Sequence, residues 1–293
     1  MKKYLKIRDK EDDFAYVDGN KIYTKELPQP IVIIEELEDG SYFGWYNFQD
    51  VYFKKTPWGD YYTSLFSKNI NPLCYCSEEL DTVFYLISRN ANTSIILSCL
   101  FAEGVDVENY SNEKLLWHDK ELMDYCKEKG RLKPISEVDF SKFSNHVVVL
   151  DDPIKRWIRV VNKIYTDDSL IRFVKEFKNT ENMSRFLDEI IYYADACEND
   201  YKFLWERHLG LQSTYIDKGA KYNDEWQIVK LEELPKWYEN TYGKKWLRNN
   251  VAKERPISRE SFTDEQWEKV LKFLERDFEF LKTVDVLLTT GER

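Results

Sequence analysis

The sequence predicts an α/β protein in which a small N-terminal antiparallel β module precedes a parallel sheet flanked by helices. Up to about residue 78, short alternating runs are separated by turn dipeptides such as Asp18-Gly19 and Asp39-Gly40, which is typical of an antiparallel meander. From residue 79 onward, apolar runs alternate with amphipathic helical segments, which is typical of an α/β domain. We therefore expect two domains, 1–78 and 79–293.

The turns of the first domain divide it into six expected strands. These are Phe14–Val17, Lys21–Lys25, Ile31–Leu37, Tyr42–Phe48, Val51–Lys55 and Tyr61–Phe66. The stretch Tyr42–Phe66 is crowded with aromatic residues, which on an exposed sheet face would form a sugar-stacking platform or a protein interface. Aromatic residues are also good strand formers, and we favour their packing into a small core.

The second domain opens with Thr82–Leu100, where an apolar β-branched run, a polar turn and a second apolar run follow one another. This order predicts a buried strand, a tight loop and a helix start. The free N–H groups and the dipole of such a helix start favour an anion, and Arg89, Thr93 and Ser94 add charge and hydroxyl donors. The alternative is an ordinary turn in which Thr93 or Ser94 caps the helix. Because the loop has no Gly and no GxxxxGK[ST] motif, this stretch by itself favours the ordinary turn.

The rest of the second domain continues the alternation. The expected elements are helix Asn112–Lys129, strand His146–Leu150, a helix that starts at Pro153, helices Ser169–Phe177 and Met183–Cys197, a segment Tyr201–Asp217, strand Trp226–Lys230, helix Glu232–Tyr242 and a long helix Phe262–Leu288. Pro153 suits a first helical turn because no N–H partner is lost there. The last helix is expected to begin at Thr263 or Asp264.

Composition limits the partners of the chain. A net charge of −10 argues against nucleic acid or an anionic membrane as the main partner, so an anionic ligand needs a local cluster of Arg and Lys. No apolar stretch approaches the length of a membrane span and the first thirteen residues contain no apolar core, so we expect a soluble, cytoplasmic protein. Five scattered cysteines suit reduced thiols. Cys74 and Cys76 with three histidines make a poor zinc set, and no metal is expected.

Three segments, in this order, resemble the 3′-phosphoadenosine 5′-phosphosulfate (PAPS)-dependent sulfotransferases, particularly the carbohydrate branch. Residues 87–94, ISRNANTS, resemble the family's 5′-phosphosulfate loop PKxxGTS, and residues 147–165, VVVLDDPIKRWIRVVNKIY, resemble its 3′-phosphate segment RDPxxRxxSxY. Residues 208–212, HLGLQ, resemble its HxxPQ element, and residues 270–281 are similar to its terminal helix. The resemblance covers about 82–281 and implies a P-loop-like fold for the second domain.

The resemblance implies that the loop backbone cradles the 5′-phosphosulfate. The residues concerned are Arg89, Asn90, Ala91, Asn92, Thr93 and Ser94. Arg89 stands in the place of the family's lysine and would stabilise charge on the leaving oxygen, without the compact geometry of an ammonium. Thr93 and Ser94 would donate to the 5′-phosphate.

The 3′-phosphate segment departs from the family pattern. Arg156 matches the family's helix arginine, although it would serve equally well as an ion-pair partner of Asp152. Asp151 replaces an arginine, and an anion beside a phosphate weakens binding by several kcal/mol at intermediate dielectric, in order of magnitude. Arg159 replaces a serine and would restore the charge. Arg255 and Arg259, in a later basic loop, are further candidates.

An acceptor hydroxyl also needs a general base. His208 matches the family position where a histidine lies near the reaction centre, and imidazole titrates near neutral pH. Gln212 would orient the acceptor or the imidazole, and Glu103, at the end of the first helix, is the fallback base. The alternative for His208 is a structural histidine in a loop.

These residues predict a sulfotransferase that moves the sulfo group of PAPS to a hydroxyl acceptor, with a carbohydrate as the expected acceptor and 3′-phosphoadenosine 5′-phosphate as the product. The alternative is a sulfotransferase-like binding or structural protein that has lost turnover, which the substitutions at Asp151 and Arg159 keep open. A P-loop kinase has less support, because the sequence shows neither a Walker lysine nor a clear metal-binding carboxylate after a strand.

Overall fold

A computed structural model describes most of the chain in two compact units. The described residues are 2–6, 14–24, 29–46, 49–55, 57, 59, 61–65, 72–107, 120–166, 183–199, 209–219, 226–247 and 256–290. The first unit comprises Met1–Asn69, Lys163–Glu206 and Ser261–Gln266, and the second comprises Ile70–Asn162, Arg207–Glu260 and Trp267–Arg293. The expected helix Ser169–Phe177 lies outside the described residues.

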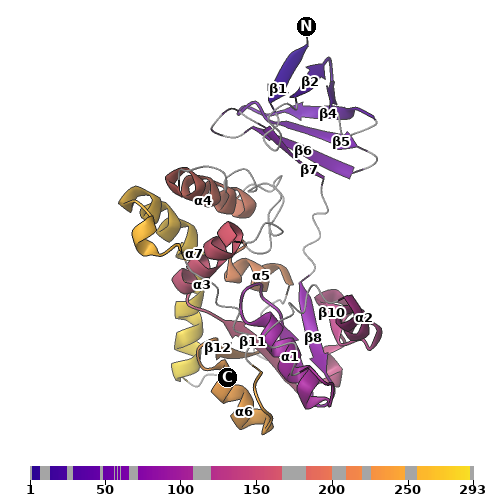
Figure 1. Cartoon of the computed structure of the whole chain (residues 1–293), viewed down its shortest axis with the longest axis vertical. Helices are drawn as coiled ribbons and strands as arrows, with labels where there is room; N and C mark the ends of the chain where they lie inside the picture. Colours follow the sequence, from indigo (N-terminus) through magenta and orange to yellow (C-terminus); the bar gives the residue numbers. More distant parts are fainter. Residues whose placement is uncertain are drawn as a thin grey trace. The chain divides into compact units, whose positions relative to one another are not determined.

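The first unit contains a seven-stranded antiparallel sheet whose strands are paired in sequence order (Figure 1). Its strands are β1 Lys3–Lys6, β2 Phe14–Asp18, β3 Lys21–Tyr23, β4 Ile31–Glu36, β5 Tyr42–Tyr46, β6 Gln49–Lys55 and β7 Tyr61–Leu65. The prediction of an N-terminal antiparallel meander is confirmed, and β1 extends it by a strand that the sequence analysis did not predict. Helix α4, Met183–Asn199, also belongs to this unit.

The aromatic residues of this sheet divide between its two faces, because side chains alternate along a strand. Tyr42, Phe53 and Tyr61 are buried in one core with Leu5 and other apolar side chains. Trp45 points the other way, is 56% exposed and pairs across the strands with Val32. The aromatic residues therefore build the core, as favoured above, and also leave exposed rings on the outer face.

The second unit contains a five-stranded mixed sheet in the order β10-β8-β9-β11-β12. These strands are β8 Leu73–Ser77, β9 Thr82–Tyr85, β10 Leu132–Pro134, β11 Asn145–Leu150 and β12 Trp226–Lys230. Strands β9, β11 and β12 are parallel, whereas β8 runs antiparallel to β9 and to β10. The α/β class is confirmed, and a P-loop-like parallel sheet is not. Strand β8 lies within residues 1–78 but forms part of this sheet.

Helices cover both faces of this sheet. They include α1 Asn92–Ala102, α2 Lys120–Glu128, α5 Gln212–Gly219, α6 Leu234–Tyr242 and parts of α3 Pro153–Thr166 and α7 Asp264–Thr290, with short 3-10 turns at Ile135–Glu137, Phe140–Lys142 and Arg259–Ser261. On one face Phe84, Val147 and Val149 join a core with residues of α1, α2 and α6. On the other face the Tyr85 hydroxyl donates to the Tyr215 carbonyl of α5 at 2.5 Å.

None of the described helices combines the length and the apolar character needed to cross a bilayer. Four described cysteines, Cys74, Cys76, Cys99 and Cys126, are free and buried. Burial raises the pKa of the Cys76 and Cys126 thiols to about 11. These thiols are therefore protonated at neutral pH and behave as small apolar groups.

Candidate anion site at the carboxyl ends of two parallel strands

The loop between β9 and α1 has an unusual backbone. Arg89 has φ 72° and Ala91 has φ 60°, so two residues other than glycine adopt the left-handed region. Each such residue costs about 1–2 kcal/mol relative to right-handed backbone. Strain of this kind is concentrated at functional sites, and successive left-handed turns aim backbone N–H groups into an anion-binding concavity.

Helix α1 begins directly from this strained loop. Its N-cap is Ala91, which makes no side-chain capping hydrogen bond, and the first helical bond joins Ile95 N to Ala91 O at 2.9 Å. Neither Thr93 nor Ser94 is the N-cap, so the prediction that one of them caps this helix is wrong. The first turn of α1 contains no acidic residue, and the dipole of a helix start favours an anion.

A second strand ends beside this loop. Because β11 is the parallel neighbour of β9, the segments that follow the two strands lie at the same edge of the sheet. Helix α3 begins at Pro153, as predicted, and its N-terminus is capped by Asp152, whose Oδ1 accepts from Lys155 N at 2.8 Å. The buried Arg156 reaches back to the first loop and donates through Nε to the Ser88 carbonyl at 3.2 Å. Arg156 thus links α3 to the loop.

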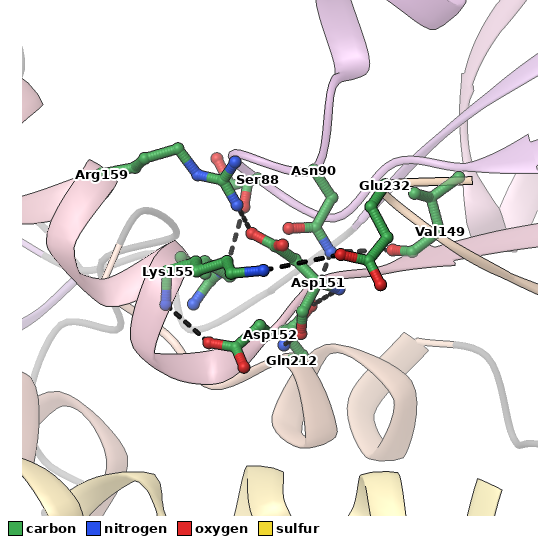
Figure 2. Close-up of polar contacts among 10 residues, drawn as sticks. Ser88, Asn90, Val149, Asp151, Asp152, Lys155, Arg159, Gln212 and Glu232 are labelled. Carbon is green, nitrogen blue, oxygen red and sulfur yellow. Dashed lines mark hydrogen bonds and ion pairs between the residues drawn. The ribbon is translucent and has the colours of Figure 1, made fainter. Parts of the chain in front are cut away.

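An ion pair marks the end of β11. Figure 2 shows the Arg159 guanidinium directed at the Asp151 carboxylate, and the two side chains form a salt bridge. The Asp151 side chain is 7% exposed and that of Arg159 is 29% exposed. The charge that Arg159 brings to this edge is therefore offset by Asp151.

A network of amides holds the loop to the end of β11. Asn90 Nδ2 donates to the Val149 carbonyl and to Gln212 Oε1, both at 2.7 Å (Figure 2). Gln212 Oε1 also accepts from Asp151 N at 2.9 Å, and Gln212 Nε2 donates to Asp151 O at 2.9 Å. Both amide side chains are buried. The role of Gln212 in orienting an acceptor stays a prediction, and the structure gives its amide three partners within the chain.

A buried carboxylate on α7 completes this network. Asp277 accepts from Gln212 N at 3.1 Å through Oδ2, and from Ser213 N and Ser213 Oγ, each at 2.8 Å, through Oδ1. It therefore caps the first turn of α5. Asp277 is not among the predicted site residues, although its position gives a signal: it continues the apolar helical stripe of Val270, Phe273 and Leu274.

The remaining predicted residues are divided between this edge and other places. The half-buried Arg89, Asn92 and Thr93 and the buried Ser94 lie in the loop and the first turn of α1. His208 and Arg255 lie outside the described residues. Arg259 stacks its guanidinium over the Trp267 ring at 4.8 Å.

Glu103, the fallback base, lies at the far end of α1 from the loop. A helix of eleven residues is about 16 Å long, so its carboxylate is distant from the N-terminal turn. It forms a salt bridge with Arg131 and accepts from Ser77 Oγ at 2.8 Å. Burial raises the pKa of Glu103, while Ser77 and Arg131 oppose that shift. Glu103 is therefore a structural residue, and its carboxylate lies too far from the loop to act as a base there.

The described residues contain no group of three His, Cys, Asp or Glu side chains arranged to hold a metal ion. Comparison of the chain with protein-family models, with curated proteins and with solved structures found no match. The resemblance to the sulfotransferases therefore depends on the three motifs alone, and it stays a prediction.

Proposed function

We propose that this protein transfers a sulfo group from PAPS to a hydroxyl acceptor, with a carbohydrate as the acceptor class. One observation carries the proposal: of the two segments that resemble the family's phosphate-binding motifs, one follows β9 and the other contains the end of β11, the parallel neighbour of β9, and the Arg156–Ser88 contact joins them. The left-handed backbone at Arg89 and Ala91 and the start of α1 support an anion at this edge.

The chemistry that the proposal requires is mainly positioning and charge stabilisation. Sulfuryl transfer resembles phosphoryl transfer, in which the group passes in line between two oxygens through a loose transition state. The acceptor oxygen forms the new S–O bond and loses its proton to a base, while the bridging S–O bond breaks and its electron pair stays on the nucleotide phosphate. Arg89 would offset that charge, and His208 would take the proton.

The residues present suit the two ends of the donor unequally. At the 5′ end, the loop backbone, Arg89, Thr93 and Ser94 offer donors and positive charge. At the 3′ end, Asp151 already engages the Arg159 guanidinium, so a 3′-phosphate meets a neutralised pair there. This pair favours a second candidate function, a sulfotransferase-like binding or structural protein without turnover. The proposal also places the protein in the cytoplasm, which its buried free thiols support.

Calorimetric titration of the full chain with 3′-phosphoadenosine 5′-phosphate tests the proposal. We expect binding that is lost in Arg89→Ala and retained in Lys142→Ala, which removes an exposed cation from the segment before β11 begins. If the wild-type protein does not bind the nucleotide at millimolar concentration, this result would contradict both the sulfotransferase and a sulfotransferase-like protein that only binds the nucleotide. Binding without transfer to any hydroxyl acceptor would favour the second candidate.

The base assignment has a separate test. His208→Ala should keep the nucleotide affinity of the wild-type protein and lose transfer, because the imidazole acts on the acceptor and not on the nucleotide. Unchanged turnover in this variant would exclude His208 as the base.

A further inference from the structure

The buried amide of Gln212 joins two segments that lie far apart in the sequence. Its Oε1 accepts from Asn90 Nδ2 at 2.7 Å and from Asp151 N at 2.9 Å, and its Nε2 donates to Asp151 O at 2.9 Å. A half-turn of the amide would place its NH₂ group against two donors. The three bonds therefore fix one orientation of this side chain.

Asn90 carries the same network into the strained loop. It lies between the left-handed residues Arg89 and Ala91, and its Nδ2 also donates to the Val149 carbonyl of β11 at 2.7 Å. Unfavourable backbone of this kind persists only where the surrounding structure over-determines it. The side chain of Asn90 is thus an anchor placed between the two strained residues.

The position of Gln212 is fixed from its other side by Asp277. Gln212 is the first residue of α5, and its backbone N–H and that of Ser213 both donate to the Asp277 carboxylate. A carboxylate at a helix N-terminus also interacts favourably with the helix dipole. The backbone of Gln212 is therefore held by α7 while its side chain holds the loop.

We propose that Gln212 is a positioning residue whose amide holds the Asn90 loop against the end of β11. With the loop fixed in this way, the start of α1 keeps a fixed position as the binding site for one anion. The proposal rests on the proposed function for the identity of that anion, the 5′-phosphate of a nucleotide. It gives Gln212 a role through the loop and not at the acceptor.

The test uses the full chain and two measurements, hydrogen exchange of the free protein and calorimetric affinity for 3′-phosphoadenosine 5′-phosphate. In Gln212→Leu and in Asn90→Leu we expect amides of residues 86–95 to exchange about tenfold faster, with an affinity loss of about tenfold. The double variant should lose less than the sum of the two single variants, because the bond between Asn90 and Gln212 is removed by both.

Two further variants separate positioning from a general loss of packing. Gln212→Glu keeps the two acceptor bonds but sets a carboxylate oxygen against the Asp151 carbonyl and buries a charge, so its exchange and its affinity loss should be at least as large as those of Gln212→Leu. Gln266→Leu is the matched control, because Gln266 is a buried glutamine of the first unit whose Nε2 donates to the Ser184 carbonyl at 2.9 Å. It should leave exchange of residues 86–95 unchanged.

The outcomes distinguish this proposal from the proposed function. Loop exchange that responds as expected, with no nucleotide binding by wild-type protein, contradicts the proposed function and supports the anchoring of the loop by Gln212. Wild-type binding with unchanged loop exchange in Gln212→Leu overturns the positioning role alone. A uniform rise of exchange across the second unit also overturns it.

Discussion

Among the described residues of the second unit, two buried carboxylates each pair with a partly exposed arginine, and the two pairs are built differently. At the end of β11, Asp151 pairs with Arg159, and the amide of Gln212 bonds to the main chain of Asp151. At the end of α1, Glu103 pairs with Arg131, and the Ser77 hydroxyl bonds to the carboxylate itself. The polar neighbours of Asp151 hold the main chain in place, whereas those of Glu103 stabilise the charge of its carboxylate.

This difference separates a candidate ligand site from a structural cluster. Around Glu103 the hydroxyls of Ser77 and Tyr75 and the Arg131 guanidinium surround one carboxylate, which is how a buried acid is stabilised within a fold. Around the loop, amides fix a strained main chain beside the start of a helix. We infer that the arrangement of amides around the loop fits an anion, whereas the cluster around Glu103 contributes to stability alone.

The largest expected effect is at the structural cluster. Arg131→Ala leaves the Glu103 carboxylate, whose side chain is 6% exposed, without its cation, and we expect a loss of about 3 kcal/mol in the free energy of unfolding, measured by urea denaturation. Arg276→Ala removes a cation from an exposed pair with Asp217 and should cost less than 1 kcal/mol. Equal losses of unfolding free energy in Arg131→Ala and Arg276→Ala would contradict the structural role assigned to the Glu103 cluster.

At the end of β11, the charge of Asp151 should act on the ligand. Asp151→Asn keeps the side-chain shape and releases the Arg159 guanidinium, so affinity for 3′-phosphoadenosine 5′-phosphate should rise about tenfold, with a smaller change for adenosine 5′-phosphate. Calorimetry measures both. Asp152→Asn is the control, because asparagine also caps a helix and Asp152 is exposed. An equal gain for both nucleotides would contradict a 3′-phosphate subsite at Arg159.

The pH dependence of stability should report on Glu103. Because its pKa is raised above the ordinary value of 4.5, the folded state binds more protons than the unfolded state just above that value. The contribution of this group to stability is complete below pH 4.5 and is lost as pH rises through the raised pKa. In Glu103→Gln this decline should be absent, as judged from denaturation between pH 4 and 7. The exposed Glu79→Gln should keep the decline.

The smallest expected effect is at the strained loop and has the opposite sign. Ala91→Gly relieves a left-handed alanine, and we expect the free energy of unfolding to rise by about 1 kcal/mol. Ala102→Gly, within α1, should instead destabilise the protein by up to about 1 kcal/mol. A loss of stability in Ala91→Gly would show that the left-handed backbone is not strained.

The sequence by itself determined the local elements of this protein. Alternation between turn dipeptides predicted six of the seven strands of the first sheet, and helical spacing predicted helices such as α3 and α6. Strand Trp226–Lys230 was predicted with its observed bounds. These features depend on residues close in sequence, whose periodicity reports which face is buried. Strands β1, β8 and β10 were missed: β1 and β10 carry too few residues for that periodicity, and β8 is buried along most of its length and shows no alternation.

Only the tertiary structure decided which strands pair and which side chains form ion pairs and hydrogen bonds. Strand β8 lies within the residues 1–78 assigned to the N-terminal module, yet it pairs with β9, because strand pairing depends on neighbours that the local pattern does not specify. Likewise, the motif predicted that Arg159 replaces a lost charge, and the structure pairs it with Asp151. The bonds of Gln212 to Asn90 and Asp277 span more than sixty residues of sequence, and hydrogen bonds of that range are set by packing and not by spacing.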